Sequence, residues 1–155
     1  MTIRKVALAL VALAMSMTVG AQNVDEVYEE AKALYDAKNY KTAVPKLKMA
    51  AEKGHKKAQY RLGRCYDKGH GVKEDNKTAF VWYQKSAAQN YAKGQYALGK
   101  CYMKGKGTTA NQEKAKLWLN KAVKNPKGGD KIKEKINKEA KEGDKDAKNI
   151  QKLLK

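Results

Sequence analysis

A stretch of the chain repeats itself at an offset of 36 residues, and this constrains the fold more than any other feature. When residues 54–87 are aligned on residues 90–123 without a gap, 13 of 34 positions are identical. Those positions are Lys57, Gln59, Tyr60, Leu62, Gly63, Cys65, Tyr66, Lys68, Gly69, Gly71, Ala79, Trp82 and Lys85. Self-similarity at this kind of period indicates units that bury their apolar faces against their neighbours.

Each unit reads as a helix, a glycine turn and a second helix. One face of the first helix is apolar at helical spacing, through Ala58, Leu62, Cys65 and Tyr66. A glycine recurs inside this helix, as Gly63 and Gly99. Glycine costs a helix about 1 kcal/mol relative to alanine, so its recurrence indicates close contact with a neighbouring helix. With a single Phe and abundant Lys, Ala and Leu, the composition disfavours sheet. We predict an all-α fold.

The residues of the first unit follow a known pattern, roughly Ala-x3-Leu-Gly-x2-Tyr-x2-Gly-x-Gly-Val-x2-Asp-x3-Ala-x2-Trp. The positions that fill it are Ala58, Leu62, Gly63, Tyr66, Gly69, Gly71, Val72, Asp75, Ala79 and Trp82. In this the chain resembles the Sel1-like repeat family, a relative of the tetratricopeptide repeats. The resemblance implies a helix-turn-helix repeat solenoid, a right-handed superhelix whose first helices line the concave side. The second copy departs from the pattern at Gly94, Thr108 and Asn111, so we expect its loop to be held less tightly.

We expect the chain to be divided into five segments. We predict a signal peptide at 1–21, a tetratricopeptide-like helix pair at 22–53, Sel1-like repeats at 54–89 and 90–124, and a C-terminal capping helix pair at 125–155. Proline is acceptable only in the first turn of a helix. Pro45 therefore places the start of the second helix of the first pair near Lys41 or Thr42.

The first 21 residues have the organisation of an export signal. Arg4 and Lys5 precede the apolar stretch 6–15, and Val19-Gly20-Ala21 offers a cleavage site after Ala21. An uncleaved membrane anchor is the alternative, but the apolar stretch is short for a bilayer, which needs about 20 residues. We expect an exported protein, periplasmic or secreted, with no membrane span after cleavage.

The residues that could carry chemistry do not form a catalytic, cofactor or metal motif. Cys65 and Cys101 occupy equivalent positions on the buried face of a first helix, so we predict two buried free thiols. His55 and His70 lie in loops, without metal-ligand spacing. Ser86 is the only serine after residue 21, and its counterpart is Ala122, which favours a packing role. We therefore expect no enzyme. The alternative is a cell-envelope hydrolase acting on β-lactam or cell-wall substrates.

The charge is strongly positive, with 34 Lys and Arg against 16 Asp and Glu, a formal net charge of +18. Only Arg4, Arg61 and Arg64 are arginines, and the lysines are spread over every segment. Because phosphate and base recognition favour arginine, we expect a solvated surface and no specific nucleic-acid partner. Weak attraction to polyanions is the alternative use of this charge.

The remaining candidate is a binding surface on the first helices. A tyrosine followed four residues later by a cation recurs at the repeat spacing, as Tyr60 with Arg64 and Tyr96 with Lys100. Tyrosine and arginine are typical anchors of binding surfaces. We predict that these four residues bind a protein or peptide ligand, and that the protein is a non-catalytic adaptor or scaffold. Alternatively, the two tyrosines only shield the seams between repeats.

Overall fold

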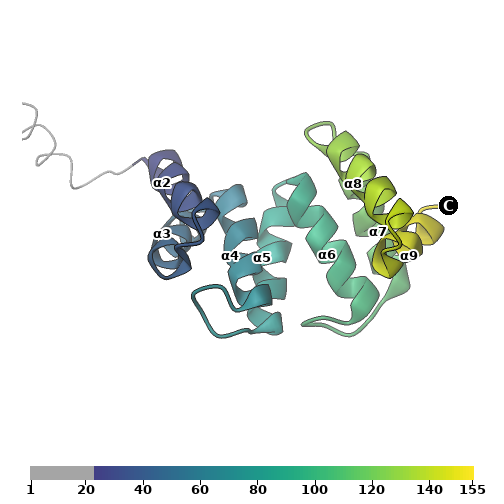
Figure 1. Ribbon diagram of the computed structural model, residues 1–155, viewed down its shortest axis with the longest axis horizontal. Helices are drawn as coiled ribbons and strands as arrows, with labels where there is room; N and C mark the ends of the chain where they lie inside the picture. Colours follow the sequence, from purple (N-terminus) through teal and green to yellow (C-terminus); the bar gives the residue numbers. More distant parts are fainter. Residues whose placement is uncertain (1–22) are drawn as a thin grey trace, which may run out of the picture.

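The computed structural model describes residues 23–155, and over this range the chain is all α-helical. The helices are α2 (Val24–Asp36), α3 (Tyr40–Glu52), α4 (Lys56–Lys68), α5 (Asn76–Ala88), α6 (Ala92–Lys104), α7 (Gln112–Val123), α8 (Gly129–Lys141) and α9 (Lys145–Leu153). They follow one another along the long axis, from α2 and α3 at one end to α8 and α9 at the other (Figure 1). The signal peptide predicted for 1–21 lies outside the described residues.

Neighbouring helices pack as successive pairs. The pairs are α2 with α3, α4 with α5, α6 with α7 and α8 with α9, and each pair also packs on the next. The first helices of adjacent units meet as well, α4 with α6 and α6 with α8. The predicted fold class, an all-α array of helix pairs, is confirmed.

The core runs through the array in two adjoining clusters. One cluster joins α2, α3 and α4 around Leu47 and Leu62. The other joins α5 to α9 around Leu119 and Ile150. Tyr66 packs against both clusters, so the apolar interior is continuous between the units. Burying this interior between neighbours leaves the outer faces of the helices free for other contacts.

The recurring glycines inside the first helices make the close contacts that their recurrence predicts. A Cβ on Gly63 would lie 2.7 Å from the ring of Tyr83, and one on Gly99 would lie 2.7 Å from Cγ of Leu119. Real Cβ atoms essentially never come that close to another heavy atom. Each glycine therefore lets the second helix of its own pair approach the first.

The glycine turns of the two repeats also fit the preceding pair closely. Gly71 and Gly107 have φ angles of +71° and +73°, which side chains rarely adopt. A Cβ on Gly71 would lie 2.7 Å from the carbonyl carbon of Tyr40, and one on Gly107 would overlap the carbonyl of Asn76. Tyr40 and Asn76 each begin the second helix of the preceding pair. The turn of each repeat therefore rests on the pair before it.

One expectation about local structure was wrong. Helix α3 begins at Tyr40, earlier than Lys41 or Thr42, and Pro45 lies in its second turn. Asn39 precedes the helix, and its Oδ1 accepts a hydrogen bond of 3.0 Å from the Thr42 hydroxyl. Pro45 has no N–H to donate to the Lys41 carbonyl, and it lies on the exposed side of the helix.

The N-terminal cap of the second helix is formed in both repeats. Asn111 accepts a 2.9 Å hydrogen bond from the Lys114 amide, and Asp75 accepts one of 3.1 Å from the Thr78 amide. Asparagine and aspartate are equally good at this helix N-terminal position. The departure from the pattern at Asn111 therefore leaves the helix cap in place.

A pair of side-chain amides ties each repeat to the preceding helix pair. Nε2 of Gln89, just after α5, donates at 2.8 Å both to the carbonyl oxygen of Gly54 and to Oε1 of Gln59. The same arrangement recurs 36 residues further on, with 3.0 Å contacts from Asn125 to Asn90 and Gln95. Because Gln59 and Gln95 are buried, these bonds satisfy groups that would otherwise be costly.

Candidate functional site

A hollow of about 320 Å³ lies among the first helices of the last three pairs. Its walls come from α4, α6 and α8, with contributions from Tyr83 of α5 and Asp146 of α9. All four residues predicted to bind a ligand line it, namely Tyr60, Arg64, Tyr96 and Lys100. We call this hollow, with these four residues and Ala97 in its wall, the basic groove.

The two repeats differ at the position that Ala97 occupies in the groove wall. In the first repeat that position is Arg61, whose Nε donates to the Tyr28 hydroxyl at 3.2 Å and whose Nη1 contacts Asp36 at 3.1 Å. In the second repeat the equivalent residue is Ala97, whose methyl group leaves the space unfilled. Sequence reasoning passed over this difference, although comparing the two copies position by position would have found it.

The two tyrosines have different exposures. Tyr60 is half-buried, with its ring 5.7 Å from that of Tyr91 and 6.0 Å from that of Tyr83. Tyr96 is only 7% exposed, and burial raises its pKa. Both rings therefore pack at seams between helix pairs and also present a surface to the groove. Contact with a ligand falls mainly to Tyr60.

The charged residues that line the groove are mostly basic. They are six cations, Arg64, Lys68, Lys100, Lys104, Lys106 and Lys135, and two carboxylates, Asp67 and Asp146. The groove therefore carries an excess of positive charge among helices that shield it from water on several sides. Such a surface favours negatively charged groups of a ligand.

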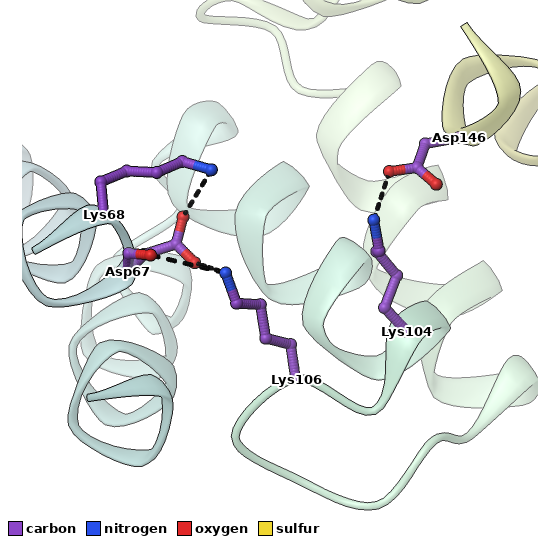
Figure 2. Close-up of polar contacts among 5 residues, drawn as sticks. All are labelled: Asp67, Lys68, Lys104, Lys106 and Asp146. Atoms are coloured by element: carbon purple, nitrogen blue, oxygen red, sulfur yellow. Dashed lines mark hydrogen bonds and ion pairs between the residues drawn. The ribbon is translucent and has the colours of Figure 1, made fainter. Parts of the chain in front are cut away.

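Both carboxylates are already occupied by lysines (Figure 2). Asp67 on α4 contacts Lys106, from the turn after α6, and its neighbour Lys68 at 3.7 Å. Asp146 on α9 contacts Lys104 at 2.6 Å. These ion pairs link α4, α6 and α9 around the groove.

Arg64 and Lys100 are the lining cations with no ion pair among residues 23–155, since Lys135 contacts Glu139 at 3.3 Å. Lys100 lies 5.3 Å from the ring centre of Tyr96, as its spacing suggests. Arg64 lies instead 5.9 Å from the ring centre of Tyr35, on the preceding pair. Burial and the nearby Lys135 lower the pKa of Lys100, which reflects the crowding of cations.

The residues that could carry chemistry elsewhere have structural roles. Cys65 and Cys101 are buried free thiols, as predicted, and burial raises the pKa of each to about 11. The Ser86 hydroxyl is buried and donates to the Lys56 carbonyl at 2.8 Å. His55 begins α4, and its Nδ1 accepts from the Ala58 amide at 3.1 Å. His70 stacks on Tyr40, with ring centres 4.2 Å apart.

Two further features of the described residues concern metal ions and membranes. Within residues 23–155, His, Cys, Asp and Glu side chains form no cluster of three or more suited to a metal ion. None of the helices in this range combines the length and the apolar character of a membrane span.

A larger hollow, of about 530 Å³, lies between the ends of α5 and α7. Trp118 and the half-exposed Leu117 form its apolar side. Its polar side is built from Asn90, Gln95 and Asn125, which hydrogen bond to one another. These amides are already engaged in joining the repeats, so the basic groove is the better candidate for binding.

Comparison with known proteins defines the class. Residues 56–91 and 92–126 match the Sel1 repeat, so the chain carries two Sel1 repeats. Sel1 repeats typically serve as scaffolds for protein interaction. Proteins of this type are generally non-catalytic, although some are β-lactamases.

Two solved structures show the same fold. A Sel1 repeat protein from Oxalobacter formigenes is 37% identical, with a TM-score of 0.60, over 63% of this chain and 39% of that one. A protective antigen of uropathogenic Escherichia coli that displays an SLR fold is 26% identical, with a TM-score of 0.66, over 84% of this chain and 29% of that one. The chain thus spans less than half the length of either. A search of curated protein sequences gives no match.

Proposed function

We propose that the protein is an exported, non-catalytic adaptor that binds a protein or peptide ligand in the basic groove. The observation that carries the proposal is the convergence of Tyr60, Arg64, Tyr96 and Lys100 on one hollow among the first helices. Repeat folds leave a long outer surface free for partners. Export rests on the signal pattern in residues 1–21.

The shape of the groove supports a segment of polypeptide as its ligand. Its volume of about 320 Å³ lies at the lower end of the range for ligand sites, so it accommodates a few side chains of a partner. Tyr60 is the half-buried aromatic at this site, and such rings anchor interfaces because they offer large contact area at little entropic cost.

The alternatives have weaker support. A cell-envelope hydrolase needs an activated nucleophile, and the Ser86 hydroxyl is buried and bonded to a backbone carbonyl. A polyanion binder would use the lysines on every helix, and its binding would weaken steeply with salt. The groove instead concentrates two unpaired cations beside tyrosine rings.

The proposal is tested by comparing the partners captured by the wild type with those captured by a variant whose groove is filled by a larger side chain. The protein, expressed from its full-length sequence with a C-terminal tag, is used to capture partners from a cell-envelope extract at low and high salt. Ala97→Trp places a large ring in the groove wall without changing charge. Ala33→Trp makes the same change at an exposed position of α2 that does not line the groove.

We expect a partner that is retained at high salt by the wild type and by Ala33→Trp, and lost with Ala97→Trp. Circular dichroism first establishes that both variants are as helical as the wild type. Capture that disappears with salt for all three proteins would support the polyanion alternative. Equal capture by all three at high salt would exclude the groove as the binding site.

A further inference from the structure

We propose that the basic groove recognises an acidic peptide segment, whose Asp or Glu carboxylates contact Arg64 and Lys100. The inference rests on the proposed function, because it names the chemistry of the ligand that the groove binds. It follows from the distribution of ion pairs around the groove, from the burial of its cations and from the rings beside them.

The ion pairs around the groove leave two of its cations without a carboxylate partner among residues 23–155. Asp67 forms ion pairs with Lys68 and Lys106, and Asp146 forms an ion pair with Lys104 (Figure 2). The two carboxylates in the groove thus pair with lysines around it, and neither forms an ion pair with Arg64 or Lys100. Among residues 23–155 neither of these two cations has a carboxylate partner, and each rests only on a tyrosine ring.

Further cations raise the positive potential at the same place. Lys93, one turn before Tyr96 on α6, is exposed, and its partial desolvation together with the nearby Arg61, Arg64, Lys131 and Lys135 lowers its pKa. Cations that crowd together repel one another in the empty groove. A ligand carboxylate relieves this repulsion and gains charge-assisted hydrogen bonds, which are about twice as strong as neutral ones.

A peptide fits these features better than a uniform polyanion. Arg64 and Lys100 are both half-buried, on different helices, and the wall between them is formed by Tyr60 and Ala97. A phosphate polymer gains most from a continuous, exposed array of basic side chains. A peptide instead brings carboxylates on short arms together with apolar groups that can cover the tyrosine rings.

The experiment titrates the protein, expressed from its full-length sequence, with labelled peptides and follows fluorescence anisotropy. One peptide contains Glu at alternating positions, and its counterpart contains Gln at the same positions. A labelled single-stranded DNA is the polyanion probe. The groove variant is Arg64→Gln/Lys100→Gln. The matched control is Lys116→Gln/Lys148→Gln, which removes the same charge from exposed positions that do not line the groove.

We expect the Glu peptide to bind the wild type and the control alike, and to bind the groove variant at least about tenfold more weakly, the effect of losing one charge-assisted bond. We expect the Gln peptide to bind the wild type about tenfold more weakly than the Glu peptide. Equal binding of the Glu peptide to both variants would overturn the inference. So would equal binding of the Glu and Gln peptides, or DNA binding that falls more in the groove variant than Glu-peptide binding does.

The results distinguish a failure of the acidic-peptide inference from a failure of the proposed function. If the captured partner is lost with Ala97→Trp but is retained by Arg64→Gln/Lys100→Gln, the groove binds protein and the acidic chemistry is wrong. If the partner is retained by Ala97→Trp, the groove is not the site and both proposals are refuted. Thermal unfolding of each variant shows whether the fold survives the loss of charge.

Discussion

Replacing Gly94 by alanine tests how the second repeat packs against the first. A Cβ at Gly94 would lie 2.5 Å from Oγ and 2.9 Å from Cβ of Ser86. In the preceding unit the equivalent positions are Ala58 and Ala50. One interface thus pairs serine with glycine, and the other pairs alanine with alanine. We therefore expect the effect of Gly94→Ala to depend on what occupies position 86.

The magnitude follows from two opposing terms. Alanine in place of glycine inside a helix stabilises by about 1 kcal/mol. Forcing a methyl group into a filled site costs about 1–3 kcal/mol. In the wild type we expect Gly94→Ala to lower the free energy of unfolding by about 1 kcal/mol. In the Ser86→Ala background the 2.5 Å contact with Oγ is gone while the 2.9 Å contact with Cβ of residue 86 remains, so we expect the same change to destabilise less than in the wild type.

The assay is urea unfolding of the wild type, both single variants and the double variant, followed by circular dichroism. Ser86→Ala alone removes the 2.8 Å hydrogen bond to the Lys56 carbonyl, at a cost of about 1 kcal/mol. The coupling free energy from this cycle isolates the contact between positions 86 and 94. If Gly94→Ala destabilises equally in both backgrounds, the clash is not with the Ser86 hydroxyl and the reasoning is refuted.

Three further predictions concern the turn, the thiols and one histidine. Gly107→Ala should lower the free energy of unfolding by at least about 2 kcal/mol in urea, because the φ is +73° and a Cβ would overlap the Asn76 carbonyl; an effect near zero would contradict this. Cys65 and Cys101 should resist Ellman's reagent in the folded protein and react in guanidinium chloride, since burial raises the pKa of each to about 11; rapid reaction of the folded protein would contradict their burial. Burial lowers the pKa of His55, so the unfolded chain binds more protons. The contribution of His55 to the free energy of unfolding should be fully present above its pKa in the unfolded chain, about 6.5. It should be lost as pH falls through the lower pKa that His55 has in the folded protein. His55→Asn should lessen that pH dependence in thermal unfolding, and an unchanged dependence would show that other groups cause it.

Local and periodic features of the fold were predictable from the sequence. The identities at an offset of 36 residues predicted the helix pairs. The recurrence of Gly63 and Gly99 indicated close helix contacts, which the structure shows to be with Tyr83 and Leu119. These features follow from one unit and its copy. The start of α3 was misplaced because Pro45 is tolerated on an exposed face in the second turn, where tertiary packing outweighs the lost hydrogen bond.

The groove depends on features that no single repeat contains. Spacing identified Tyr60, Arg64, Tyr96 and Lys100, and the structure brings all four to one hollow. The hollow is lined by Ala97 where the first repeat has Arg61, and its charge balance depends on ion pairs that join residues far apart in the sequence. The spacing of the tyrosines could not predict that Tyr96 is buried, because the side chains around it include those of α8, which lies outside the repeats.

Photo-crosslinking in living cells tests the central proposal most directly. A photoreactive phenylalanine analogue at Ala97 would sit in the wall of the basic groove, and the same analogue at Ala33 would sit on the exposed face of α2. We predict that light links position 97 to a protein, identified by mass spectrometry, through a segment rich in Asp and Glu. Position 33 should not form this product. The same products from both positions, or none from position 97, would contradict the assignment of the groove as the binding site.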